Sequence, residues 1–398
     1  MNNIQNKHST ITITICFLIA VIEGIDIQAA GIAAAGIREA FALNSSQLGI
    51  FFSAGILGLL PGALIGGHYA DQLGRRIVLI WAVSVFALFT LCTVWVNSFY
   101  SLLLVRFLAG AGLGAAMPNL IILASEAVTV EKRARAVGLM YCGMPLGAAI
   151  LSYIASLDFG TNWKNIFYLG GILPIVIIPI MIKFLPESCE FLKTRSKEYI
   201  KIEQQRSFKL LFQQNYTNRT LLLWVSYFFT LMVVYIMLSW LPSLFIELGF
   251  SRKEGSIAQF FFMISATIGT VILGILTDRW NKIYVILLMY SGILVGLLSL
   301  NAADSLIQMY LAAILTGSFV IGCQSVLYAF GSILYPTEIR GTGVGSAAAV
   351  GRIGAMLGPT IAGQLLTMGS GATGVISAAI PCIVISALCM LFLIHKIR

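Results

Sequence analysis

The amino-acid sequence predicts an all-α polytopic membrane protein with twelve transmembrane helices in two halves of six. Of its 398 residues, 59% are hydrophobic and only 10% are charged, which is more apolar surface than a soluble fold of this size needs. The apolar runs are long enough to cross a bilayer as helices, whereas the strands of a barrel would alternate apolar and polar residues. These two observations exclude a soluble fold and a β-barrel.

Twelve apolar stretches are the expected spans. They cover residues about 10–35, 46–69, 77–96, 99–126, 134–157, 163–185, 220–242, 256–277, 283–300, 306–332, 342–367 and 373–394. The first is too long for a signal peptide and carries two acidic residues where such a peptide is apolar, so we expect it to stay attached.

Basic residues are distributed unequally over the two sides of the membrane. If the N-terminus lies inside, 19 of the 25 Lys and Arg residues fall on the cytoplasmic side and four on the outer side, while Arg106 and Arg352 lie within spans. Cytoplasmic loops carry an excess of Lys and Arg, so both termini are expected in the cytoplasm. The net charge of +9 follows from this topology, and no nucleic acid is expected as a partner.

A long polar stretch, residues 187–219, divides the chain into a six-helix half at 1–186 and a second at 220–398. The halves repeat each other weakly, because GGHYADQLGRR after the second span recurs as GILTDRWNK after the eighth, and SEAVTVEKRARAVG recurs as YPTEIRGTGVG. Parallel six-span repeats are typical of secondary transporters that bind substrate near the midplane between the halves. The polar stretch is interpreted as a solvated cytoplasmic linker.

The seven cysteines are scattered without a C-x-x-C pair, and the three histidines lie in the tails or at a span end. This pattern predicts no metal site, no disulfide framework and no cofactor. An enzyme is not expected, because a cluster of His, Cys or acidic side chains would be needed for catalysis within the membrane.

Two acidic residues, Glu23 and Asp26, lie within the first span. Each charge at this depth costs about 2.5 to 3.5 kcal/mol on insertion scales. A spacing of three places both carboxyls on one helical face, and two close carboxyls in a medium of low polarity favour the protonated form of at least one. We interpret them as proton carriers, with a structural pair that bonds a neighbouring helix as the alternative.

The loop after the second span has the pattern G-x-x-x-D-R/K-x-G-R-R/K, with Gln72 where a basic residue is usual; its members are Gly67, Asp71, Gly74, Arg75 and Arg76. The fourth span contains R-x-x-x-G-x-x-x-G from Arg106 to Gly114, in which the small residues allow close helix approach. In these motifs the chain resembles the major facilitator superfamily.

The resemblance implies that charged loop residues lock and release the cytoplasmic face. The expected gating residues are those of the loop pattern together with Glu126, Arg133, Asp278, Arg279, Glu338 and Arg340. The alternative is that these charges only set topology.

Further motifs indicate a branch of the superfamily. Glu126 followed by Arg133, LPES at 185–188 and PTEIRGTG at 336–343 resemble the sugar and organic-ion porters, although Thr129 and Ala134 replace a usual Pro and Gly. An acid-G-x-D motif in the first span is characteristic of aromatic acid:proton symporters, and here Glu23 stands where Asp is commoner. In the fifth span, GLMYCGMPLGA is similar to the antiporter motif, but Met144 separates Gly143 from Pro145.

Depth and the superfamily's packing imply a pair between the first and fourth spans. At about 1.5 Å per residue, Asp26 lies roughly 24 Å and Arg106 roughly 21 Å from the cytoplasmic side of the bilayer. We therefore predict that they pair and that protonation of Asp26 breaks the pair, which would bias alternating access. A static buried salt bridge is the alternative.

Substrate binding is expected around Arg352, which lies about 15 Å into the eleventh span. No acid of the second half lies at this depth, so its partner is either the substrate carboxylate, as we predict, or Glu23 or Asp26. Candidates to stack on a substrate ring or to bond its hydroxyl are Tyr141, Tyr227, Tyr235, Trp240, Gln324 and Tyr328, although aromatic residues in spans more often serve packing.

The resemblance implies a monomeric carrier in the bacterial inner membrane that imports aromatic carboxylates with protons. Hydroxylated phenylpropanoid acids such as 3-(3-hydroxyphenyl)propionate are the expected substrates. Alternatives are a symporter of another organic acid or sugar, a drug:proton antiporter, and a membrane sensor or lipid-modifying enzyme. The scarcity of Asn and Gln in the central spans counts against a sugar, and Arg352 counts against the antiporter.

Overall fold

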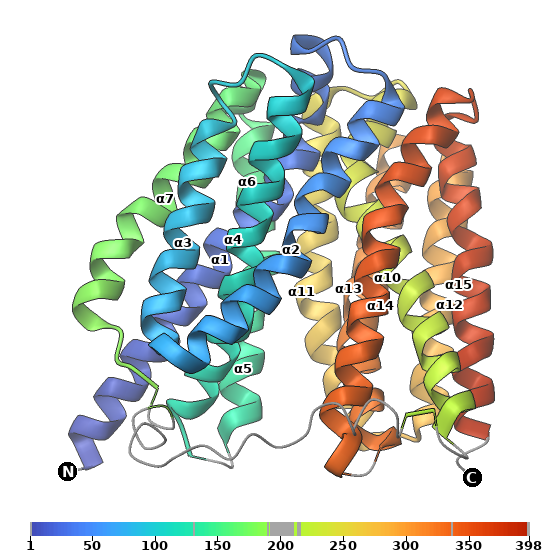
Figure 1. Cartoon of the computed structure of the whole chain (residues 1–398). Helices are drawn as coiled ribbons and strands as arrows, with labels where there is room; N and C mark the ends of the chain where they lie inside the picture. The colour runs from blue at the N-terminus through green and yellow to red at the C-terminus, as the bar shows by residue number, and fades with distance from the viewer. Residues whose placement is uncertain are drawn as a thin grey trace. The chain divides into compact units, whose positions relative to one another are not determined.

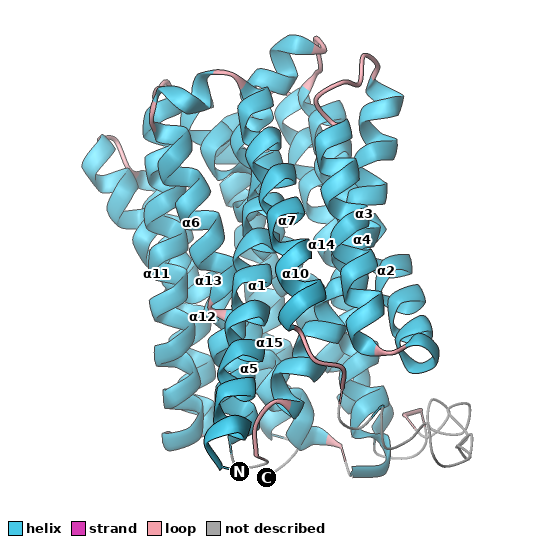
Figure 2. Cartoon of the chain, turned by 90° about the vertical axis from the view of Figure 1, so that its left-hand side faces the viewer, coloured by secondary structure: helices cyan, strands magenta, loops and turns pink. Residues whose placement is uncertain are grey.

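The computed structural model describes residues 2–129, 132–188, 191, 211–212, 216–335 and 337–395, and the regular structure in these ranges is helical throughout (Figure 2). The chain divides into two compact units, one of Met1–Leu43 with Ile50–Ile200 and one of Asn44–Gly49 with Lys201–Arg398. Most of the predicted linker at 187–219 lies outside the described residues, so the predicted domain boundaries stay a prediction.

The helices of the first unit are coloured blue to green in Figure 1. They are α1 (Asn2–Ala40), α2 (Ser45–Leu73, whose first turn belongs to the second unit), α3 (Arg75–Cys92), α4 (Phe99–Glu126), α5 (Arg133–Tyr141), α6 (Gly143–Ser156), the 3₁₀ turn η2 (Asp158–Thr161) and α7 (Trp163–Phe184). Helix α1 packs against α4, α5, α6 and α7, and α3 packs against α4 and α7.

The described residues of the second unit form six long helices, coloured yellow-green to red in Figure 1. They are α10 (Tyr216–Glu247), α11 (Arg252–Arg279), α12 (Lys282–Ala302), α13 (Leu306–Leu334), α14 (Thr337–Thr367) and α15 (Gly371–His395). Helix α10 packs against α14 and α15, α11 packs against α13, and α12 packs against both α13 and α15.

Eleven helical stretches of the described residues are long and apolar enough to cross a membrane. They include the predicted fifth span as one stretch, although its helix is interrupted at Cys142. Pro145 explains the interruption, because its missing N–H cannot bond the carbonyl of Tyr141. The predicted eleventh span lies in α14, a helix of 31 residues that is not among the eleven stretches.

Glycines bring α2 and α4 together at their backbones, as the spacing of small residues predicts. A Cβ atom placed on Gly110 would overlap the carbonyl oxygen of Gly55, and one on Gly114 would overlap that of Leu59. Backbones that approach this closely fix the register of the two helices.

Helices α1 and α6 meet in the same way. A Cβ atom on Gly24 would overlap the Met144 carbonyl oxygen, and one on Gly147 would overlap that of Val21. Gly24 lies between the two acidic residues of α1, so this contact holds the acid-bearing turn against α6.

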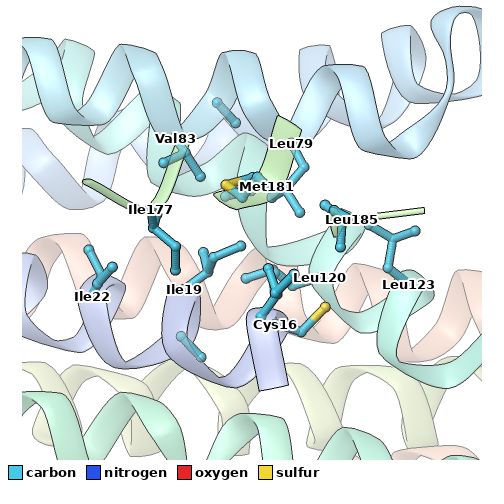
Figure 3. Close-up of a cluster of buried hydrophobic side chains, with 14 of the residues drawn as sticks. Cys16, Ile19, Ile22, Leu79, Val83, Leu120, Leu123, Ile177, Met181 and Leu185 are labelled. Carbon is cyan, nitrogen blue, oxygen red and sulfur yellow. The ribbon is translucent and has the colours of Figure 1, made fainter. Parts of the chain in front are cut away.

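An apolar core fills the first unit on the N-terminal side of the acids. Figure 3 shows side chains from α1, α3, α4 and α7 meeting there, among them Cys16, Ile19, Val83, Leu120 and Met181. On α1 the buried members of this core extend to Ile22, next to Glu23, and Ile27 packs against the core from the other side of the acids.

Candidate functional site

Asp26 of α1 and Arg106 of α4 form the predicted pair. Arg106 Nη1 lies 3.6 Å from Asp26 Oδ1. The same carboxylate oxygen accepts a hydrogen bond of 2.6 Å from the hydroxyl of Thr90 on α3. Three helices thus converge on one oxygen atom. The predicted pairing of Asp26 with Arg106 is confirmed. The part of this pair in proton coupling stays a prediction.

Asp26, Arg106 and the neighbouring Glu23 are all buried. Glu23 is 1% exposed, Asp26 is fully buried, and Arg106 is 5% exposed. Among the described residues, no hydrogen-bond partner is found for Glu23 Oε1, Asp26 Oδ2, or Nε and Nη1 of Arg106. Buried polar atoms without partners are rare and costly, and in membrane spans they indicate a functional site.

Two aromatic rings hold the guanidinium in place. The Arg106 Cζ atom lies 5.9 Å from the ring centroid of Phe51 and 5.6 Å from that of Phe167. Cations are attracted to ring faces at this range. Gly55 lies beside the side chain, where a Cβ atom would be in ordinary van der Waals contact with Arg106 Nη2 at 3.7 Å.

The buried group contains two carboxyls for one guanidinium. Glu23 lies close enough to Asp26 for their charges to interact, and Cys16, about two turns before Glu23 on α1, also lies within electrostatic range of Glu23. If both carboxyls were ionised, one buried negative charge would lack a partner, which is costly in a medium of low polarity. A proton held by either carboxyl balances the group, so the arrangement is suited to binding and releasing protons.

The second unit carries Arg352 on α14, half-buried and close enough to Tyr235 of α10 for an electrostatic interaction. Tyr328 of α13 interacts with the same tyrosine. No ion pair joins Arg352 to a described acidic side chain of its own unit. In such an arrangement the guanidinium can bind the carboxylate of an aromatic acid, and a tyrosine can contact its ring.

The other substrate candidates differ in their surroundings. Tyr328 is 37% exposed and makes an edge-to-face contact with the ring of Tyr227 at 5.6 Å, whereas Tyr227 is fully buried. Gln324 is half-buried on α13, and Tyr141 is exposed on α5 in the first unit. Trp240 is buried and donates a hydrogen bond of 3.0 Å to the carbonyl of Pro359, so it joins α10 to α14, and its stacking on a substrate ring stays a prediction.

In the predicted gating loop between α2 and α3, Asp71 and Arg75 form an ion pair at 2.5 Å. Arg76 donates to the carbonyl of Ile182 at the end of α7. Gly67 has open space around it. Gly74 has a φ of 99°, a conformation that favours glycine, and a Cβ atom there would overlap the carboxylate of Glu187.

Residues of the LPES motif connect this loop to α4. The Glu187 carboxylate accepts a hydrogen bond of 3.0 Å from the Arg76 backbone N–H, in the first turn of α3. The hydroxyl of Ser188 donates to Glu126 at 2.6 Å. Arg133, the other predicted gate of this half, is half-buried at the start of α5.

The gating residues of the second half are described only in part. Arg279 is exposed at the end of α11, and Arg340 Nε lies 3.4 Å from the carbonyl oxygen of Tyr335, to which it donates. The side chains of Asp278 and Glu338 lie outside the described residues, so their predicted role in gating stays a prediction. In the part of the chain that is described, no three His, Cys, Asp or Glu side chains are grouped to hold a metal ion.

Sequence reasoning missed Thr90, the two rings beside Arg106, and Glu187. A threonine or phenylalanine within an apolar span has no distinctive spacing, so nothing in the sequence singles out Thr90, Phe51 or Phe167. Glu187 lies in a motif that was noticed, but its contact with α3 depends on how α7 ends.

Comparison with known proteins identifies the family. The Major Facilitator Superfamily model matches residues 16–359 and 247–397. The chain is 45% identical to the 3-(3-hydroxyphenyl)propionate transporter of Escherichia coli strain K12, over 97% of this chain and 94% of the relative. It is 33% identical to a gallate transporter of Pseudomonas putida (90% and 86%) and 34% identical to the 4-hydroxybenzoate transporter PcaK of Acinetobacter baylyi (91% and 86%).

Solved structures agree in fold. The crystal structure of a D-xylose-proton symporter superposes with a TM-score of 0.78 at 16% identity, covering 96% of this chain and 97% of the symporter. A bacterial homologue of the human lysosomal transporter Spinster, in an inward-facing and occupied conformation, gives 0.76 at 16% identity and covers 96% of each chain. The chain therefore belongs to the major facilitator superfamily.

Proposed function

We propose that this protein imports aromatic carboxylates together with protons by alternating access, and that 3-(3-hydroxyphenyl)propionate or a related hydroxylated phenylpropanoid acid is its substrate. The observation that carries the proposal is the buried group of Glu23, Asp26 and Arg106, which has more carboxyls than cations. The substrate class is supported by the relatives at 33–45% identity, each named as a transporter of an aromatic acid.

Asp26 is the coupling acid in this proposal. When Asp26 is ionised, it pairs with Arg106. When it is protonated, the pair is broken and the two states favour different conformations of the carrier. Glu23 lies within electrostatic range of Asp26, so it can share this proton. Binding of the substrate is its alternative role in the proposal.

Arg352 captures the substrate carboxylate. Its guanidinium can bind a carboxylate through two parallel hydrogen bonds. No described acidic side chain of its own unit forms an ion pair with it. Tyr235 lies within electrostatic range of Arg352, and Tyr328 lies within electrostatic range of Tyr235, so both are candidates for contact with the ring. Gln324 and Tyr141 complete the proposed set.

In this proposal the protein is a monomer of two six-helix halves in a bacterial inner membrane. Its two termini and the polar segment at 187–219 lie in the cytoplasm. The support is the excess of Lys and Arg in the loops on that side. The loop residues that include Asp71 with Arg75, and their counterparts in the second half, act as cytoplasmic gates.

The proposal is tested by uptake of radiolabelled 3-(3-hydroxyphenyl)propionate into proteoliposomes under an inward pH gradient. We expect accumulation above equilibrium that a protonophore abolishes. Labelled xylose and a cationic dye serve as probes for the sugar and drug alternatives. Uptake of either in place of the aromatic acid, by protein shown to be folded, would contradict the substrate assignment.

A further inference from the structure

The two oxygens of Asp26 differ in their surroundings. Oδ1 accepts the hydrogen bond from Thr90 at 2.6 Å and is the atom that faces Arg106 Nη1 at 3.6 Å. Oδ2 is buried and finds no hydrogen-bond partner among the described residues. One oxygen is therefore occupied, and the other is available for a proton.

We infer that Asp26 binds its proton on Oδ2, and that Thr90 is the positioning residue that holds Oδ1 between α3 and α4. The inference rests on the proposed function for the role of the proton. A proton on Oδ2 leaves Oδ1 as a carbonyl oxygen, which still accepts the Thr90 hydrogen bond. The carboxyl thus changes charge without losing its position.

The groups that face Asp26 are few. Glu23 lies on its own helix and Arg106 on α4. From α7, Gly170 is adjacent, since its Cβ position would lie 3.8 Å from Oδ1. Helix α6 meets α1 through Met144 and Gly147, which do not titrate, and α5 contributes Met140 to the apolar core.

Thr90 therefore favours the ionised form of the site. A hydroxyl that donates to a carboxylate stabilises the charged state more than the neutral one, because charge-assisted hydrogen bonds are stronger. Removing the hydroxyl alone should let the site bind a proton at lower proton concentration. The pH at which proton-driven uptake is half-maximal should then move upward.

The first experiment compares the pH profiles of uptake for Thr90→Val, Thr90→Ser and the wild type. Valine keeps the shape and lacks the donor, so we expect the midpoint to rise by about one pH unit. Serine keeps the hydroxyl and should restore the wild-type profile. Thr316→Val is the matched control, because Thr316 is also fully buried but donates to the carbonyl of Ala312 in its own helix.

A second experiment uses no substrate. Infrared difference spectra of the purified protein between high and low pH report the C=O stretch of each protonated carboxyl, and Asp26→Asn identifies the band of Asp26. A band that moves to higher frequency in Thr90→Val, and returns in Thr90→Ser, supports a proton on Oδ2 with Oδ1 bonded to Thr90. An Asp26 band unchanged in Thr90→Val overturns the inference.

The two experiments separate the possible failures. If the wild type accumulates no substrate but the infrared band shifts as expected, the proposed function fails and the position of the proton stands. If the wild type accumulates substrate and Thr90→Val leaves both the midpoint and the band unchanged, the inference fails and the proposed function stands.

Discussion

Arg106 Nη1 lies 3.6 Å from Asp26 Oδ1, which is within ion-pair range but longer than a strong charge-assisted hydrogen bond. A pair held at this distance can be separated at less cost than one joined by two short hydrogen bonds. The geometry is consistent with a pair that opens and closes during transport.

Replacing Asp26 with Asn tests this pair. The amide keeps the size of the side chain but cannot exchange a proton, so we expect loss of gradient-driven accumulation while substrate exchange between the two sides persists. Uptake and counterflow in proteoliposomes measure the two activities separately. Asp304→Asn, the same change at an exposed acid, should leave both intact. A variant of Asp26 that still concentrates substrate would exclude it as the coupling acid.

Arg352→Lys keeps the charge and removes the planar fork of the guanidinium. We expect the KM for uptake to rise about tenfold or more, because a hydrogen bond to a charged group contributes about 1.5 to 3 kcal/mol. Initial uptake rates over a range of substrate concentrations measure the effect. Arg252→Lys, on the exposed first turn of α11, is the control and should leave the KM unchanged. An unchanged KM in Arg352→Lys would contradict the role in carboxylate capture.

Gly147→Ala should destabilise the protein, since the added methyl group would overlap the Val21 carbonyl in α1. Overpacking of this kind costs about 1 to 3 kcal/mol. Gly138→Ala provides the comparison, because the Gly138 position in α5 has nothing within 4 Å and a helical Gly-to-Ala change stabilises by roughly 0.5 to 1 kcal/mol. Thermal unfolding in detergent measures the effect: the Tm of Gly147→Ala should be lower than that of the wild type, and the Tm of Gly138→Ala should not.

Gly74→Ala should cost more than Gly249→Ala. Both glycines have positive φ, 99° and 92°, but only Gly74 lies against a side chain, the carboxylate of Glu187. Combining Gly74→Ala with Glu187→Ala should therefore cost less than the sum of the two single changes, and a double-mutant cycle on Tm measures the coupling. Additive effects would show that Glu187 can move away without strain.

The sequence was sufficient for the helical architecture and for the acid–arginine pair. Long apolar runs define membrane helices regardless of their neighbours, and Asp26 and Arg106 are conspicuous because charges at such depth are rare. Depth along each helix then placed them at one level. The apolar runs and the depths are one-dimensional signals, whereas the choice of the fourth span as the neighbour of the first came from the packing that the resemblance to the superfamily implies.

Other parts of the site depend on three-dimensional packing. Thr90 resembles any threonine of an apolar helix until α3 is placed beside α1, and the hydrogen bond from the Trp240 indole N–H to Pro359 depends on how α10 packs against α14. The interruption of the fifth span at Cys142 was also not foreseen, although Pro145 in the sequence is its physical cause.

Gly24 places the two acids at a direct backbone contact. It lies between Glu23 and Asp26 and contacts the backbone of Met144, so no side chain separates α1 from α6 at this turn. The backbone contacts at Gly24 and Gly147 hold the part of α1 that carries both acids directly against α6. In the proposed mechanism, gain or loss of a proton would therefore be accommodated by the long side chain of Arg106 rather than by displacement of the acids themselves.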